Sequence, residues 1–431
     1  MTTPSLKEIA ARIAGYDPEA LPVAQAQEFI ARLVPRVQTV EMLPLRSALG
    51  RVLARDLVSP LNVPAHDNSA MDGYALRGSD LAPDGPTRLV PAGTGLAGQP
   101  FDGSVAPGQC LRITTGAVMP PGLDTVVPQE FVKLGADGTV VIPSGAVRPG
   151  DNRRLAGEDL AAGSAALSAG RIIRPADLGL IASLGAAEVP VWRRLRVAFF
   201  STGDELRSIG EALDEGCVYD SNRYTLWGML ARLNVELIDL GVVRDEPAAL
   251  EAAFRQASAS ADAVITSGGV SVGEADYTKR IMAELGEVLF WRIAMRPGRP
   301  MAIGRIGSAR SGDRQAILFG LPGNPVAVMV TFYAFVRDAL LAMSGATVEP
   351  LPMLRAASTQ PIRKKPGRTE YQRGIVARAA DGGWQVSITG SQGSGILRSM
   401  SVANGLVVLH HGQGNVAAGE TVDVIPFDGL V

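Results

Sequence analysis

The sequence is poor in cysteine and histidine, with only two cysteines and three histidines among 431 residues. Cys110 and Cys217 lie far apart and form no CxxC pattern, which argues against a thiolate zinc site and a disulfide framework. A centre built on imidazole could draw only on His66, His410 and His411, which we expect to be solvated. A transition-metal site made of cysteine or histidine is therefore not expected.

Long hydrophobic runs and excess basic charge are also missing. No run of about 18 apolar residues occurs, and the opening MTTPSLKEIAARIAG has no apolar leader segment. The 41 Lys and Arg residues face 43 Asp and Glu, for a net charge of -2, which argues against bulk nucleic-acid binding. We therefore expect a cytoplasmic protein with no membrane or nucleic-acid partner, in which local basic clusters and backbone amides hold any anionic ligand.

The composition is that of a globular protein, with 46% hydrophobic and 19% charged residues, and the length calls for several domains. The pattern predicts a multi-domain α/β fold. Residues 1–63 and 148–192 form a helical and mixed domain, and residues 64–147 a β-rich insertion. Residues 193–345 form an α/β domain, and residues 346–431 a small β-barrel domain.

Local patterns support these divisions outside the α/β domain. Apolar residues recur at helical spacing over 21–34 and 45–57, and PADLGLIASLG predicts another helix. In the insertion, EFVKLGADGTVVIP predicts a hairpin, because Asp137-Gly138 suits a tight turn between alternating strands. After residue 350, short alternating runs are separated by DGG, GSQGSG and ANG, which is typical of a small β-domain.

Strands and helices alternate through the α/β domain. Helices are expected at 221–233, with Ser221 as the N-cap, and at 247–257, 277–285 and 326–343. Such alternation indicates a parallel sheet with helices on both faces. Ligands of such sheets bind beyond the carboxyl ends of the strands, so the chemistry should lie in the loops that follow them.

Three of those loops combine glycine with small polar residues. Glycines there let backbone N–H groups approach a phosphate, and helix N-termini favour negative charge. A tight turn is an equal explanation for any one loop, but the three together favour anion binding. The candidate residues are Ser201, Thr202 and Gly203; Ser267, Gly268, Gly269 and Ser271; and Pro322, Gly323, Asn324 and Pro325.

Two other nucleotide-binding patterns are disfavoured. No Walker A sequence GxxxxGK[ST] is present, which disfavours a P-loop NTPase. A literal GxGxxG occurs at Gly93, Gly95 and Gly98, but Pro100 and a glycine-rich stretch follow it where a dinucleotide site would need a helix.

Charged residues of both signs cluster at the same expected edge of the sheet. Carboxylates beside phosphates need a mediating cation, and Mg²⁺ fits because it shares hard oxygen ligands with phosphates. Arginines in FWRIAMRPGRP could grip a phosphate or another oxyanion. Solvated loop charges are the alternative for each residue taken alone. The carboxylates are Asp204, Glu205, Asp245, Glu274 and Asp276, and the arginines are Arg292, Arg296 and Arg299.

The ordered set of motifs resembles the molybdopterin molybdenumtransferase family, of the MoeA and gephyrin E-domain type. The motifs are DNSAMDGYA, TTGA, STGDEL, YDSNR, SGGVSVGEADYTK, RPGRP, LPGNP and GRTEYQRG. The resemblance covers nearly the whole chain. It implies a MogA-like molybdopterin-binding domain, a homodimer, and Mg²⁺-dependent release of AMP from adenylylated molybdopterin as molybdate is inserted. Since the chain has two cysteines, the substrate's own dithiolene must supply the sulfur ligands of molybdenum.

The resemblance also implies roles for single residues. Catalytic roles fall to Asp72, Thr115, Glu205, Asp245 and Asp276, with Asp159 as a weaker candidate, and the metal ligands are Glu205, Asp245 and Asp276. Arg292 and Arg296 stand where the family often carries lysines, so anion attraction is kept but not a role that needs a deprotonatable amine. The remaining expected binding residues are the loop residues named above with Asp220, Ser221, Arg373 and Ser394.

Two alternatives stay open at the level of sequence. One is molybdopterin adenylyltransferase, the preceding step, which shares the α/β domain but lacks DNSAMDGYA and the terminal β-domain. The other is a non-catalytic molybdopterin-binding scaffold, against which the acidic residues argue. An adenylyltransferase and the acceptors of the finished cofactor are the expected protein partners.

Overall fold

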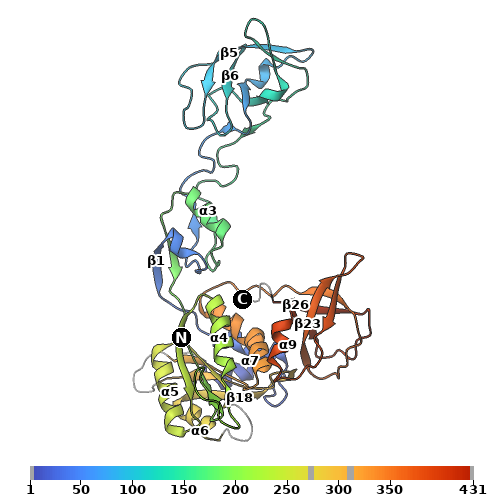
Figure 1. The fold of residues 1–431 in the computed structure, drawn as a ribbon. Coiled ribbons are helices and arrows are strands. Elements are labelled where there is room, and N and C mark those ends of the chain that lie inside the picture. The colour runs from blue at the N-terminus through green and yellow to red at the C-terminus, as the bar shows by residue number, and fades with distance from the viewer. Residues whose placement is uncertain (1–3, 270–275, 308–314, 428–431) are drawn as a thin grey trace. The chain divides into compact units, whose positions relative to one another are not determined.

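The computed structural model describes residues 4–269, 276–307 and 315–427, with the backbone alone at 276–279 (Figure 1). The chain divides into two compact units. The large unit comprises Met1–Glu41, Gly50–Ala54 and Val191–Val431, and the small unit comprises Met42–Leu49 and Arg55–Pro190.

A six-stranded sheet forms the centre of the large unit. Its order is β16 (Glu236–Val243), β13 (Arg196–Thr202), β17 (Ala263–Ser267), β21 (Ala316–Leu321), β20 (Pro300–Ile306) and β18 (Gly286–Arg292). The predicted parallel sheet is confirmed for the first four strands, whereas β20 and β18 run antiparallel. A parallel neighbour needs a crossover of a dozen or more residues, and the short connections on either side of β20 are too brief for one.

Helices cover both faces of this sheet, as predicted. They are α4 (Ser221–Arg232), α5 (Pro247–Ser260) and α6 (Asp276–Leu285), and Figure 1 shows α5 and α6 together on one side and α4 beside α7 (Pro325–Thr331) on the other. Phe200 of β13 packs with Phe254 of α5 and Met282 of α6 in the core of one face. The buried strand β17 is apolar at most positions because both of its faces are covered.

The helix predicted over 326–343 is one apolar run of three segments: α7, the π-helix η4 (Phe332–Val336) and α8 (Arg337–Met343). Its 19 residues have a mean hydropathy of 1.7, enough in length and composition to cross a membrane. However, 67% of its most apolar window is buried in the protein, so it is a core helix of the large unit.

The N-terminal helices pack on the large unit, which differs from the predicted grouping of residues 1–63. Ser5 and Glu8 form a capping box at the start of α1 (Leu6–Ala11), and α2 (Val23–Leu33) buries one apolar face. The ring of Phe29 meets Trp291 of β18 edge-on at 5.0 Å between centroids. Long-range aromatic packing of this kind decides the grouping and leaves no local trace in the sequence.

The predicted C-terminal barrel is present. Its strands are β22 (Leu354–Ser358), β23 (Thr369–Arg378), β24 (Trp384–Ile388), β25 (Gly405–Leu409) and β26 (Thr421–Pro426), and the pairing of β23 with β25 closes the ring. The short β19 (Met295–Arg296) pairs with β23 and so ties the barrel to the loop ahead of β20. Helix α9 (Leu397–Val402) precedes β25.

The small unit holds a second six-stranded sheet. Its order is β7 (Thr125–Pro128), β4 (Gly73–Leu76), β6 (Gln109–Ile113), β5 (Thr87–Gly95), β9 (Val140–Ile142) and β8 (Lys133–Leu134). The predicted hairpin is confirmed, because β8 and β9 pair antiparallel around Gly138 at φ 79°. Gly93 and Gly95 lie inside β5 and not ahead of a helix.

The other elements of the small unit are short. The predicted helix 175–185 is α3 (Pro175–Ser183), but the predicted helix over 45–57 is wrong. That stretch contains the 3-10 turn η1 (Leu45–Ala48) and β2 (Leu57–Val58), and Gly50 at φ 72° interrupts the apolar pattern. The remaining strands are β1 (Val40–Pro44), β3 (Asn68–Ser69), β10 (Arg153–Arg154), β11 (Ala165–Leu167) and β12 (Glu188–Trp192).

Candidate active site

A polar cavity of about 900 Å³ lies at the carboxyl ends of the parallel strands of the large unit. The loops that follow β13, β17 and β21 all line it, so the three glycine-rich segments converge. The N-terminus of α4 and two stretches outside the parallel strands complete the wall. These stretches are Arg296–Gly298, ahead of β20, and Gln392–Gly395, ahead of α9.

Glycine is required where two of these loops touch. Gly268 has φ 98°, and a Cβ there would lie 2.4 Å from the carbonyl oxygen of Thr202. Gly323 faces Gly268, whose Cα would lie 3.9 Å from a Cβ at 323. The bare backbone at these positions keeps side chains out of the cavity, while the Gly268 N–H donates to the Leu321 carbonyl at 3.1 Å and joins the two loops.

The acidic residues that follow β13 and β16 are linked by hydrogen bonds. The hydroxyl of Thr202 donates to the carboxylate of Asp245, and the backbone N–H of Asp245 donates to Asp204 Oδ1 at 3.2 Å. Glu205 also lines the cavity. Of the other acidic or loop residues predicted here, Glu274 and Ser271 lie outside the described residues, as does the side chain of Asp276.

The cysteines and histidines take no part in the cavity. His66, His410 and His411 are exposed, as predicted. Cys110 is buried in the small unit, where burial raises the pKa of its thiol to about 12. Within the described parts of the chain, no group of three or more histidine, cysteine, aspartate or glutamate side chains is arranged to hold a metal ion.

Two arginines bring positive charge to one side of the cavity. Arg296 is exposed, and Arg373 is fully buried, with its Nε donating to Ser399 Oγ at 2.9 Å and its Nη2 to the Gly393 carbonyl at 2.9 Å. Burial, with the repulsion of Arg296, lowers the pKa of Arg373 to about 10. Of the two, only Arg296 lines the 900 Å³ cavity, and both line an adjoining cavity of about 260 Å³. No carboxylate among the described residues forms an ion pair with either one.

Arg292 does not belong to this group, contrary to the sequence-based expectation. Its guanidinium pairs with Glu19 at 3.0 Å, and its backbone N–H bonds the Pro18 carbonyl. Arg292 ends β18 and Arg296 ends β19, and of the two only Arg296 lines the cavity.

Tyr219, Asp220, Ser221 and Asn222 of the YDSNR motif line the cavity. Asp220, and not Ser221, is the N-cap of α4, because its side chain accepts a hydrogen bond from the N–H of Arg223. Asp220 also accepts from Ser201 Oγ at 3.0 Å, so Ser201 lies behind the cavity wall. Asn222 donates to Ser267 Oγ at 2.8 Å and to the Gly323 carbonyl at 2.6 Å, which joins α4 to the loops after β17 and β21.

Most of the expected binding residues line this cavity. They are Thr202, Gly203, Asp220, Ser221, Ser267, Gly268, Gly269, Arg296, Pro322, Gly323, Asn324, Pro325 and Ser394. Sequence reasoning missed Tyr219, Asn222 and Gln392. The YDSNR motif could have drawn attention to the first two, whereas GSQGSG gave no more than a turn pattern.

The expected residues Asp72 and Thr115 lie in the small unit and contact each other. Asp72 Oδ1 accepts hydrogen bonds from the backbone N–H of Thr115 at 2.7 Å and from its hydroxyl at 2.9 Å. These bonds, the backbone one first, lower the pKa of Asp72. Both residues are exposed, as is Asp159. An ionised carboxylate is therefore presented on this surface at neutral pH.

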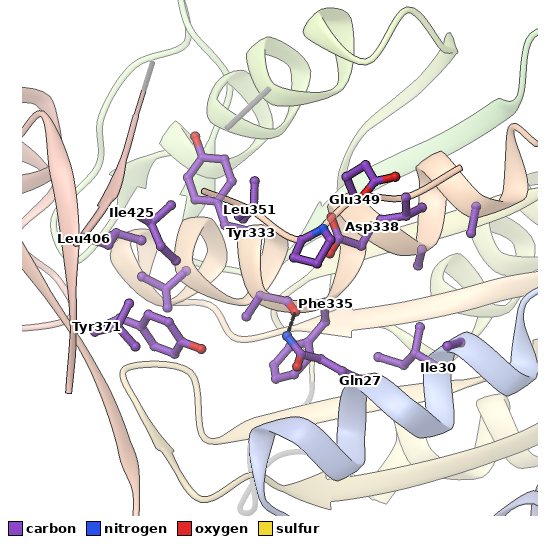
Figure 2. Close-up of a pocket in the computed structure, with 18 of the residues that line it drawn as sticks. Gln27, Ile30, Tyr333, Phe335, Asp338, Glu349, Leu351, Tyr371, Leu406 and Ile425 are labelled. Atoms are coloured by element: carbon purple, nitrogen blue, oxygen red, sulfur yellow. Dashed lines mark hydrogen bonds between the residues drawn. The ribbon is translucent and has the colours of Figure 1, made fainter. Parts of the chain in front are cut away.

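A second cavity of the large unit is apolar. It measures about 510 Å³ and lies between α2, the helix 325–343 and the barrel (Figure 2). Figure 2 shows Phe335, Leu351 and Tyr371 around it, with Gln27 donating to the Ala334 carbonyl at 3.0 Å. Its lining has neither glycine loops nor arginines, so it is not suited to phosphates.

Comparison with known proteins assigns the architecture to a family. Residues 21–185 match the MoeA N-terminal region (domain I and II), residues 198–342 a probable molybdopterin binding domain, and residues 355–427 the MoeA C-terminal region (domain IV). The chain is 42% identical over 412 residues to the molybdopterin molybdenumtransferase of Haemophilus influenzae, covering 95% of this chain and 100% of that one.

Two further relatives agree. The molybdopterin molybdenumtransferase of a Nostoc species is 37% identical over 413 residues, covering 94% of this chain and 93% of that one. The crystal structure of a molybdopterin biosynthesis moeA protein from Pyrococcus horikoshii superposes with a TM-score of 0.79 at 27% identity, covering 94% of this chain and 99% of that one. With matches across all of its domains, the chain belongs to the molybdopterin molybdenumtransferase family.

Proposed function

We propose that the protein is a transferase of molybdenum cofactor biosynthesis that inserts molybdate into adenylylated molybdopterin and releases AMP. The observation that carries the proposal is that glycine loops, the carboxylates of Glu205 and Asp245, and Arg296 all line one cavity of about 900 Å³, with Arg373 in the adjoining cavity. That cavity has the size of a large ligand site and the polar lining that phosphates need. The names of the relatives support the same reaction.

The backbone of the glycine loops would hold the pyrophosphate link. Gly268 and Gly323 bring main-chain groups to the cavity without side-chain bulk, and the N-terminus of the twelve-residue α4 opens on the same space. Amide groups and a helix N-terminus both favour negative charge.

Glu205 and Asp245 would hold Mg²⁺ in this proposal. The donor set fits, because Mg²⁺ commonly takes one or two carboxylates and completes its shell with water and substrate phosphates. The Thr202 hydroxyl occupies only Oδ1 of Asp245 and leaves Oδ2 available. Asp276 would be the third ligand. When bound, the ion would neutralise charge on the phosphates during cleavage.

The chain's own groups then have separate tasks. Asp245 is positioned by Thr202 to orient or deprotonate the water whose oxygen ends on one phosphorus as AMP leaves. Arg296 and Arg373 attract the molybdate dianion. The two thiols of the substrate's dithiolene displace one oxo group of molybdate, which leaves as water with their two protons. Asp72 and Thr115 would also have catalytic roles.

The protein would work as a homodimer in the cytoplasm. The large unit exposes apolar residues that a second copy could cover, among them Ile209 at 65%, Leu213 at 50% and Trp227 at 53% exposure. An adenylyltransferase would supply the substrate, and acceptor enzymes would take the product.

Incubation of the protein with adenylylated molybdopterin, Mg²⁺ and molybdate tests the proposal. We expect AMP to appear in proportion to molybdate, and equal amounts of molybdenum cofactor. Adenylylation of free molybdopterin by ATP, with release of pyrophosphate, would favour the adenylyltransferase. Binding without any turnover would favour the scaffold.

A further inference from the structure

Tyr219 presents a fixed aromatic ring to the cavity. It ends β15 (Val218–Tyr219), which pairs parallel with β14 (Leu206–Arg207), so its backbone is held in a small sheet. Its hydroxyl donates to the Glu211 carbonyl at 3.0 Å, yet the residue is 46% exposed and lines the cavity. An exposed ring anchored at its far end is suited to stacking on a planar ligand.

The two polar side chains that follow have unused acceptors. Asp220 is 2% exposed and Asn222 is 8% exposed, and both line the same cavity. Asp220 Oδ2 and Asn222 Oδ1 are buried without a hydrogen-bond partner. The amide of Asn222 cannot be turned round, because its nitrogen must donate to the Gly323 carbonyl. Buried acceptors without donors are costly, and a ligand N–H would relieve them.

The side chains of Asp220 and Asn222 are anchored on neighbouring strands of the sheet. Ser201 and Ser267 are register partners on β13 and β17. Asp220 is bonded to Ser201, and Asn222 to Ser267. The hydrogen bonds thus fix both side chains at the carboxyl ends of neighbouring strands, next to the ring of Tyr219.

We infer that Tyr219, Asp220 and Asn222 form the wall that recognises the heteroaromatic ring of the substrate, and that this ring is the pterin. The unused groups are both acceptors, so the ligand edge must present donors. A pterin offers two adjacent donors, its 2-amino group and N3–H, whereas adenine alternates its donor with ring-nitrogen acceptors. The assignment rests on the proposed function, since it names the part of that substrate held here.

Binding of two separate probes to the full-length protein tests the inference. The first is 6-hydroxymethylpterin, which has the ring but no phosphate, sulfur or nucleotide, followed by its fluorescence. The second is AMP, followed by calorimetry. We expect Tyr219→Ala and Asp220→Asn each to weaken pterin binding about tenfold, as loss of stacking or of one acceptor would, and to leave AMP binding within about twofold.

Three variants keep the result interpretable. Asparagine is as good an N-cap as aspartate, so Asp220→Asn should retain α4 and the unfolding temperature. Tyr219→Phe keeps the ring and should bind pterin within about twofold of the parent. Phe131→Ala removes a 54% exposed aromatic ring of the small unit and should change neither probe.

Each other outcome overturns the assignment. If the parent protein does not bind the pterin, or if both variants bind it unchanged, Tyr219, Asp220 and Asn222 do not recognise the pterin. If the variants weaken AMP binding and leave pterin binding intact, these residues bind adenine and not pterin. Failure of the proposed function is distinguishable, because it appears as absent molybdate-dependent AMP release while pterin binding still responds to Tyr219→Ala.

Discussion

The Thr202 hydroxyl donates a hydrogen bond to the Asp245 carboxylate and so joins the ends of β13 and β16 at the cavity. The contact engages Oδ1 of the carboxylate and leaves Oδ2 available. It explains why an acidic residue on an exposed loop can have a defined position.

Replacing this carboxylate should stop the chemistry and spare the fold. We expect Asp245→Asn to lower kcat for AMP release about 100-fold, because asparagine can accept from Thr202 but cannot serve as a base or an anionic ligand. Chromatography of released AMP measures the rate. Glu251→Gln removes an exposed carboxylate of α5 and should be neutral. Equal rates of AMP release by Asp245→Asn and the parent protein would show that Asp245 takes no part in catalysis.

The placement of three arginines predicts unequal effects on molybdate. Arg296→Ala should raise the KM for molybdate about tenfold with little change in unfolding temperature, because the exposed guanidinium has no carboxylate partner among the described residues. Arg299→Ala removes an exposed arginine of the same loop outside the cavity and should leave the KM unchanged. Arg292→Ala should behave like Arg299→Ala. A large effect of Arg292→Ala would restore the sequence-based assignment.

Steric contact at Gly268 predicts a sharp difference between two glycines with positive φ. Gly268→Ala should destabilise the protein by about 3 kcal/mol, from the conformation at φ 98° and the clash with the Thr202 carbonyl. Gly138→Ala, at φ 79° with open space around it, should cost about 1 kcal/mol. Chemical unfolding measures both. Similar costs would mean that the loops adjust freely around residue 268.

Asp177 should make the small unit sensitive to acid. Hydrogen bonds from Arg171, and then from the backbone of Arg174, lower the pKa of its carboxyl below the ordinary 3.8, against the effect of burial. A lowered pKa stabilises the fold above 3.8, and that contribution is lost as the pH falls through the lowered value. Asp177→Asn should therefore cost about 2 kcal/mol at pH 7 and progressively less in acid.

Guanidinium unfolding at several pH values checks this dependence. Asp84→Asn, on an exposed loop of the same unit, is the control and should change stability little at any pH. A cost for Asp177→Asn that stays constant into acid would show that its effect is not one of charge.

The sequence was most informative where function depends on local chemistry. Gly268 and Gly323 could be predicted to lie at one cavity, because the alternation of strands and helices directs the loops that follow the strands to one edge of the sheet. Asp220 was expected to bind ligand but not to cap α4, since Ser221 is an equally good cap by type. The hydrogen bond from the N–H of Arg223 identifies Asp220 as the cap, and Ser201 holds the same side chain through a second hydrogen bond.

Long-range packing was beyond such reasoning. Phe29 places α2 on the large unit through Trp291, and Gln392 reaches the cavity only because β19 pairs with β23. Arg292 and Arg296 are the same residue type in one short segment and cannot be told apart from the sequence. In the structure, Arg292 forms an ion pair with Glu19, whereas Arg296 lines the cavity. The pairing of Arg292 with Glu19 depends on the tertiary fold and cannot be predicted from residue types.

The closed ring of β22 to β26 has a consequence for solubility. Each of these five strands is paired on both sides, since β23 joins β25. Unpaired strand edges are the usual templates on which chains add to one another and aggregate. The barrel offers no such template within its ring, so damage that opens the β23–β25 seam should promote aggregation.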